Sequence, residues 1–306
     1  MKQHKYVLAT LVLLWGFLAV LGAQTVLQQA DDLYWADHYE QAKELLLHQL
    51  PSVTNPTEKA EILWRISRAT LAIGDELKAD GASDDILFAT FEEGQEYANE
   101  AIATAAVPRG YVYRASNVGR WGETKGPLNS LSKAKPMRDD FTYVIDTLSV
   151  MDDTIAWYVL GQLYYKLPGW PISFGDINTA ISYTRMAIET ISPSNLYHGH
   201  FKALAEMLWK RGLSAAKRSS KINSIEKDWN KAKGSTLDRY AYYEGGLGGS
   251  YQPFYSPVAL NKMSDQQEAV MLLKFAMAKY EMWPFHSRAD QRTYKEIAQL
   301  LTDWGF

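Results

Sequence analysis

The stretch between residues 153 and 193 constrains the fold more than any other part of the chain. In its first half a tryptophan, a leucine, a glycine and a tyrosine recur at the spacing of one helix face, and small residues follow on a second amphipathic segment. The glycine lets a neighbouring backbone approach where a side chain would block it. The stretch therefore predicts two closely packed helices. We assign this packing role to Trp157, Leu160, Gly161, Tyr164, Ala180 and Ala187.

The W-x2-L-G-x2-Y spacing that these residues make is typical of the first helix of a tetratricopeptide (TPR) repeat. The connection to the second helix is unusual, because the loop LPGWPISFGD, residues 167–176, carries roughly seven residues more than the usual repeat. Long loops between packed helices are more often functional than idle. This loop is therefore a candidate functional element.

Helical stripes separated by Gly and Pro continue along the rest of the chain. Asn55, Ser264 and Ser287 stand where N-caps of three further helices are expected. No alternation typical of strands extends over a useful length. We therefore expect an all-α protein, in which residues 24–306 form one TPR-like helical-hairpin superhelix (α-solenoid) of about five helix pairs with long loop insertions.

The N-terminus has the order of a secretory signal. Lys2 and Lys5 precede an apolar run, which ends at the small residues Gly22 and Ala23. We expect residues 1–23 to be a signal peptide, with a retained signal anchor as the alternative. The protein would then be periplasmic, and tethered to the inner membrane if the signal is not cleaved. The chain has no cysteine, which excludes the lipoprotein route, disulfides and thiolate metal sites.

Charge and motifs argue against several classes of function. The net charge is −3 with both signs mixed along the chain, so there is no polybasic surface for nucleic acid. Phosphate loops, HExxH and nucleophile elbows are missing, and we expect no catalytic residue, no cofactor and no metal. His198 and His200 form an HxH motif, for which we expect a surface or capping role, because residues two apart point to different sides of a helix.

A second enlarged loop, residues 123–135, precedes the first by about one repeat. We expect its preceding helix to end at Gly119 and Gly122, and Pro136 to open the next helix. In a regular stack two such loops lie side by side on one edge. Their aromatic rings and cations either anchor the loops to the core or wall a cavity for an apolar ligand with a polar head. The candidate ligand-binding residues are Arg114, Asn117, Arg120, Trp121, Lys125, Trp170 and Phe174.

Two segments resemble the T component that accompanies TRAP-type solute transporters, a family of periplasmic TPR proteins. They are NVGRWGETKGPLNSLSKAKP, residues 117–136, and LYYKLPGWPISFGDINTAISYTRMAIE, residues 163–189. The resemblance extends over most of the chain from about residue 24 onward. It implies association with the substrate-binding P component of a TRAP system, and a helical array that encloses a channel or pore for hydrophobic solutes.

We therefore expect a non-enzymatic periplasmic accessory protein of a TRAP-type uptake system. It would dock a substrate-binding protein and bind or pass a small hydrophobic or amphipathic solute through an aromatic-lined cavity, as a monomer or a homo-oligomer. One alternative is a TPR scaffold for protein–protein interaction without a ligand cavity. Another is an all-α carbohydrate-active enzyme, which would need two carboxylates within about 5 to 10 Å of each other across an aromatic cleft.

Overall fold

The computed structural model describes residues 25–245 and 252–306. Every regular element within these ranges is a helix, so the expected all-α class is confirmed. The expected signal, residues 1–23, lies outside the described residues. No helix in the described ranges is both long and apolar enough to cross a membrane. The α-helices are α2 (Val26–Trp35), α3 (Tyr39–Gln49), α4 (Pro56–Ala79), α5 (Asp84–Thr104), α6 (Pro108–Lys125), α7 (Leu131–Thr142), α8 (Thr154–Lys166), α9 (Ile177–Glu189), α10 (His198–Arg211), α11 (Ala215–Lys231), α12 (Thr236–Tyr240), α13 (Asp265–Glu281) and α14 (Arg288–Asp303).

Side-chain caps fix several of these boundaries. At the start of α4, Asn55 accepts a hydrogen bond from the backbone N–H of Glu58 at 3.1 Å. Ser264 accepts one from the backbone N–H of Gln267 at 3.2 Å, and the amide oxygen of Gln267 accepts from the backbone of Ser264. Ser287 opens α14 with a similar capping box. The expected starts of all three helices are confirmed, since each cap satisfies backbone donors that the helix itself leaves free.

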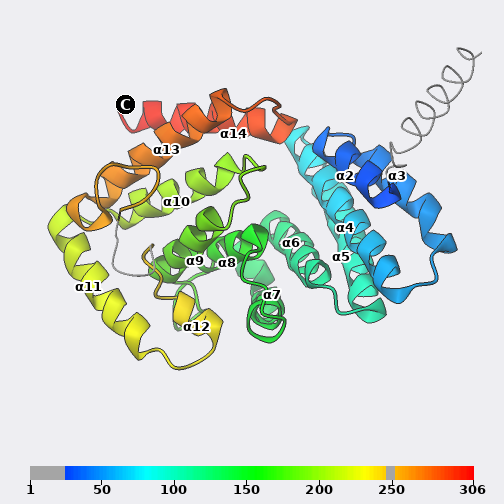
Figure 1. Ribbon diagram of the computed structural model, residues 1–306, viewed down its shortest axis with the longest axis horizontal. Coiled ribbons are helices and arrows are strands. Elements are labelled where there is room, and N and C mark those ends of the chain that lie inside the picture. Colours follow the sequence, from blue (N-terminus) through cyan, green and yellow to red (C-terminus); the bar gives the residue numbers. More distant parts are fainter. Residues whose placement is uncertain (1–24, 246–251) are drawn as a thin grey trace, which may run out of the picture.

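Helices that follow each other in sequence pack against each other, as α2 with α3, α4 with α5, and α8 with α9 (Figure 1). Further contacts join α5 to α6 and α9 to α10. The order is interrupted after α10, which packs against α13, while α11 and α12 lie to one side in Figure 1. The fold is therefore a succession of packed helix pairs, with α11 and α12 inserted in sequence between the packed helices α10 and α13.

The last helix begins against the first helices. In Figure 1, α14 starts beside α2 and α4 and runs away from them to the C-terminus. Arg292 of α14 places Nη1 3.2 Å from Oε2 of Glu76 on α4, and Arg288 Nε lies 3.3 Å from the same oxygen. The backbone N–H of Arg288 also donates to the Asp37 carboxylate at 2.7 Å. These contacts close the succession of helices on itself.

Trp157 belongs to a large buried cluster formed by α6 to α9 and α12. Its side chain is 0% exposed, and its Nε1 donates to the carbonyl oxygen of Met151 at 2.9 Å. The rings of Tyr183 and Tyr240 lie 5.7 and 5.3 Å away from it, centroid to centroid. The indole is thus both packed and hydrogen-bonded, which is the usual arrangement of a buried tryptophan.

The close contact between α8 and α9 depends on Gly161. A Cβ atom there would lie 2.2 Å from Oγ1 of Thr184 and 3.1 Å from the carbonyl oxygen of Ala180. Leu160, Ala180 and Ala187 are fully buried, and Tyr164 is half-buried against Phe174. These residues therefore hold α8 and α9 together.

Two expected helix boundaries around residues 119–136 are wrong. Helix α6 passes through Gly119 and Gly122 and ends at Lys125, and the next residue, Gly126, has a φ of 89° that suits a glycine. Gly122 is a contact position instead, because a Cβ atom there would lie 3.2 Å from the hydroxyl oxygen of Ser130. Pro136 lies inside α7, which starts five residues earlier at Leu131. Most of the expected loop is consequently helical.

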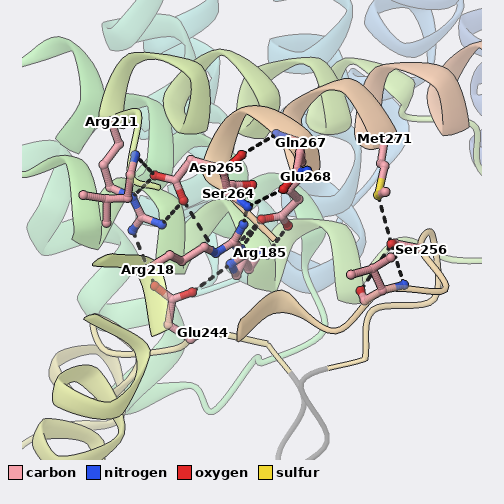
Figure 2. A network of polar contacts seen from close by, with 12 residues as sticks. Arg185, Arg211, Arg218, Glu244, Ser256, Ser264, Asp265, Gln267, Glu268 and Met271 are labelled. Atoms are coloured by element: carbon pink, nitrogen blue, oxygen red, sulfur yellow. Dashed lines mark hydrogen bonds and ion pairs between the residues drawn. The ribbon is translucent and has the colours of Figure 1, made fainter. Parts of the chain in front are cut away.

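A network of buried charges joins α9, α10, α11 and α13 (Figure 2). Glu268 lies at its centre, and its two carboxylate oxygens accept from Arg185 at 2.7 and 2.9 Å. Arg218 also donates to Glu268. Burial raises the pKa of Glu268, but Arg185 and Arg218 outweigh burial and lower it to about 2. The members of the network are Arg185, Arg211, Arg218, Glu244, Asp265 and Glu268.

Candidate functional site

A cavity of about 390 Å³ lies where the start of α14 meets α2 and α4. Side chains from α2, α4, α6, α7, α8, α10 and α14 line it, so helices far apart in sequence share one hollow. Aliphatic side chains and aromatic rings make up much of its wall. A pocket of this size and lining suits a small, mainly apolar organic molecule. The aromatic lining residues are Tyr34, Trp35, Tyr113, Tyr158 and Tyr197.

One side of the cavity carries a chain of ion pairs. Arg120 Nε lies 2.8 Å from Oδ1 of Asp75, and Arg120 Nη1 lies 3.0 Å from Oε2 of Glu123. Lys166 donates to the other oxygen of Glu123. Burial raises the pKa of Glu123, yet Arg120 and Lys166 outweigh it and lower the pKa to about 2. All four side chains line the cavity, and their charges are satisfied by one another.

Lys133 is a cavity-lining cation of a different kind. Its side chain is half-buried, and no carboxylate of the described chain lies within ion-pair distance of it. The Nζ atom lies 5.5 Å from the ring centroid of Trp121. A cation held by an aromatic face but lacking a counter-ion can accept an anionic group of a ligand.

His198 and His200 both line the cavity and are buried, so the expected surface role is wrong. The start of α10 lies against α14, where His198 Nε2 is 3.0 Å from the carbonyl oxygen of Asp290. The His200 ring stacks on Tyr158 with 4.2 Å between centroids, and on Tyr197 with 5.0 Å. The HxH motif thus contributes to the cavity wall through long-range packing.

Burial lowers the pKa of His200 from 6.5 to about 3, and the positive charge of Lys279 and the neighbouring His198 act in the same direction. Between these two pH values the unfolded imidazole is protonated while the folded one is not. The unfolded state then binds more protons, so the free energy of unfolding must fall as the pH falls through this interval.

Replacing His200 with phenylalanine should remove this pH dependence. The variant keeps a flat ring between the two tyrosines but has no proton to bind. Between pH 6.5 and 4.5, above the range in which most carboxylates titrate, its free energy of unfolding should fall less steeply than that of the wild type. Urea unfolding at several pH values measures both slopes. Parallel slopes for the two proteins would contradict a buried neutral His200.

Of the seven residues that the sequence suggested for ligand binding, Arg120 lines the cavity. Trp121 lies beside it, because its ring supports Lys133 and its Nε1 donates to Glu92 at 3.0 Å. The Lys125 ammonium lies over the ring of Phe88, 5.5 Å from its centroid. The cation that the cavity presents is therefore Lys133 and not Lys125.

Two more of the seven candidate residues form hydrogen bonds between helices. Arg114 Nε donates to Asp140 of α7 at 2.9 Å. Asn117 is fully buried, and its Nδ2 donates to the hydroxyl of Ser67 on α4 at 3.0 Å. Neither residue is among those that line the cavity.

The loop between α8 and α9 holds the last two candidates. Trp170 is 90% exposed, so it neither anchors the loop to the core nor faces the cavity. Phe174 packs on Tyr164, with 5.0 Å between ring centroids, and the Arg138 guanidinium lies 4.6 Å from its ring. Arg138 belongs to α7 and lies beyond the expected loop 123–135, so this contact joins the loop between α8 and α9 to helix α7.

Lys133, His198 and His200 are among the cavity residues that sequence reasoning missed. Lys133 lies within the expected insertion, but its relation to Trp121 depends on the helical course of that segment. The two histidines were visible as a motif at a helix start, without a signal for burial. In the described part of the chain, no group of three His, Asp or Glu side chains is arranged to hold a metal.

Comparison with protein-family models and with curated proteins finds no match to this chain. The residues around the cavity are therefore the basis for the function proposed below.

Proposed function

We propose that the protein is a periplasmic, non-enzymatic helper of solute uptake, built as a TPR-like superhelix related to the T components of TRAP-type transporters. In this role it docks a substrate-binding P protein, and it binds or passes a small amphipathic solute. The observation that carries the proposal is the aromatic-lined cavity of about 390 Å³ between the two ends of the helical array.

The cavity wall favours a ligand with an apolar body and an anionic end. Burying apolar ligand surface there contributes on the order of 25 cal/mol per Å². Asp75, Arg120, Glu123 and Lys166 already neutralise one another, so together they add little net charge. Lys133 is therefore the lining residue that can bind a carboxylate or a similar anionic group of the ligand.

A second hollow of about 350 Å³ supports a route through the array. It adjoins the first, because both are lined by residues of α2, α4, α6 and α14, among them Tyr34, Leu71 and Thr293. The ion pairs of Arg288 and Arg292 with Glu76 cross the same junction between α14 and α4. A solute that moves from one hollow to the other would pass beside this junction.

A fatty acid of medium chain length, decanoate, is a suitable probe of the proposed cavity. Lys133→Ala should weaken its binding about tenfold, because a hydrogen bond to a charged group contributes about 1.5–3 kcal/mol. Lys125→Ala removes a cation of the same connection outside the cavity lining and should leave the affinity unchanged. Isothermal titration calorimetry measures the affinity of the wild type and of both variants for decanoate. Equal affinities, or a wild type that does not bind decanoate, would overturn the assignment.

A further inference from the structure

Three tyrosines from distant parts of the chain line the cavity together. Tyr34 lies on α2, Tyr113 lies on α6, and Tyr197 immediately precedes α10. The guanidinium of Arg68 lies 3.9 Å from the ring centroid of Tyr34 and 5.2 Å from that of Trp64. The Tyr113 ring stacks on Trp64, with 5.6 Å between centroids. Arg68 and Trp64 therefore hold the first two tyrosine rings close to each other.

The hydroxyl groups of Tyr34 and Tyr197 lie deep in the protein and still reach open space. Burial raises the pKa of both hydroxyls, and the nearby phenol of Tyr113 acts on each in the same direction. Neither hydroxyl forms a hydrogen bond with the residues that the structure describes, and neither oxygen is fully enclosed by protein atoms. A buried tyrosine hydroxyl usually has a hydrogen-bond partner. Since both residues line the cavity, a molecule inside it can be that partner.

The backbone that carries one of these rings is also unusual. Tyr197 has φ 39° and ψ 38°, a left-handed conformation that an aromatic residue rarely adopts. Residues in such conformations are concentrated at functional sites, where the surrounding structure maintains them. The strained residue and the available hydroxyl thus coincide in the cavity wall.

The tyrosines and Lys133 lie at different levels of the cavity. Tyr113 precedes Arg120 by two turns of α6, a distance of roughly 10 Å along the helix axis. Lys133 lies at the level of Arg120, because its ammonium is over the ring of Trp121, the next residue of α6. A ligand whose anionic end meets Lys133 therefore directs its other end toward the tyrosines.

The charges around the tyrosines limit what this end of the cavity can bind. Arg68 forms an ion pair with Asp31, and Arg109, which also bonds the Tyr113 hydroxyl, lies 3.0 Å from Asp153. Both cations already have a carboxylate partner, so they do not require a second anion. A phenol hydroxyl can donate one hydrogen bond and accept others. An uncharged hydroxyl group, which has the same capacity, is the matching partner.

We propose that the hydroxyls of Tyr34 and Tyr197 bind a hydroxyl group at the far end of the ligand, so that the cavity selects ω-hydroxylated carboxylic acids over plain ones. This inference rests on the proposed function, because it assumes that the cavity binds a solute whose anionic end meets Lys133. It adds a neutral polar subsite, between α2 and α10, to the cationic one on α7.

The test compares three ligands by isothermal titration calorimetry. They are decanoate, ω-hydroxydecanoate with a hydroxyl on its last carbon, and α-hydroxydecanoate with a hydroxyl beside the carboxylate. The wild type should bind ω-hydroxydecanoate about tenfold more tightly than decanoate, and α-hydroxydecanoate as decanoate.

Phenylalanine variants remove the hydroxyls and keep the rings. Tyr34→Phe and Tyr197→Phe should each reduce the preference for ω-hydroxydecanoate, and the double variant should abolish it while keeping its affinity for decanoate. Tyr242→Phe is the matched control, because it removes a phenol hydroxyl outside the cavity lining and should behave as the wild type does. The helical circular dichroism signal checks that each variant is folded.

The outcomes separate this inference from the proposed function. If the wild type binds decanoate and ω-hydroxydecanoate equally well, the tyrosine subsite is wrong and the cavity proposal stands. If α-hydroxydecanoate shows the same gain, or the double variant retains the preference, another part of the wall binds the hydroxyl and the assignment to the tyrosines is overturned. If the wild type binds none of the three ligands, both proposals fail.

Discussion

Replacing Glu268 with alanine should lower the free energy of unfolding by about 3–5 kcal/mol. The carboxylate is 0% exposed and accepts hydrogen bonds from Arg185 and Arg218, both of which are also buried. Its loss leaves two guanidinium groups in the interior with reduced compensation, because only Glu244 and Asp265 remain near them. Urea unfolding of the wild type and of Glu268→Ala at neutral pH measures the difference in their free energies of unfolding.

A surface ion pair provides the matched control. Lys135 and Asp139 lie 2.6 Å apart on one helix face, and their side chains are 71% and 52% exposed. Asp139→Ala should therefore change stability by less than about 1 kcal/mol. The wild type should also lose stability as the pH falls from 4.5 to 2, because the pKa of Glu268 is lowered over that interval and the unfolded state takes up the proton first. Similar stabilities of Glu268→Ala and Asp139→Ala would contradict the role assigned to the network.

Trp157→Ala should destabilise the protein by about 3–5 kcal/mol. The substitution removes a fully buried indole, the hydrogen bond to Met151 and the contacts with Tyr183 and Tyr240. The cavity that remains cannot collapse freely, because α8 is held against α9 at Gly161. Thermal and urea unfolding, followed by the helical circular dichroism signal, measure the loss.

Trp170→Ala is the control for this second experiment, since it removes the same side chain from a neighbouring segment. Trp170 is 90% exposed, so its loss should change stability by less than about 0.5 kcal/mol. If both tryptophan variants were equally destabilised, the central packing role of Trp157 would be wrong.

Much of the helical fold could be predicted from local sequence. The repeat residues around Trp157 predicted the packing of α8 against α9, and the caps at Asn55, Ser264 and Ser287 predicted helix starts that the structure confirms. These features depend on residues within a few positions of one another. Periodicity and capping chemistry record such short-range requirements directly.

The cavity could not be predicted in the same way. It exists because α14 returns to α4, and Arg292 meets Glu76 across more than two hundred positions of sequence. The same return buries His198 beneath Asp290. No local pattern records such contacts. The sequence suggested Lys125 as a ligand-binding cation, whereas Lys133 lines the cavity. Their placement depends on α6 continuing through Gly122, which makes a close contact with Ser130.

The central claim is that the hollow between the start of α14 and the N-terminal helices holds a small molecule. Native mass spectrometry of the protein, isolated without denaturation from the cells that make it, tests this most directly. Ala134 is buried in the cavity wall next to Lys133, so Ala134→Trp fills the hollow and serves as the comparison. The wild type should carry an added organic mass that denaturation releases, and the filled variant should lack it while keeping its helical signal. A wild type that carries no more mass than its own chain, in the same state as Ala134→Trp, would contradict the account.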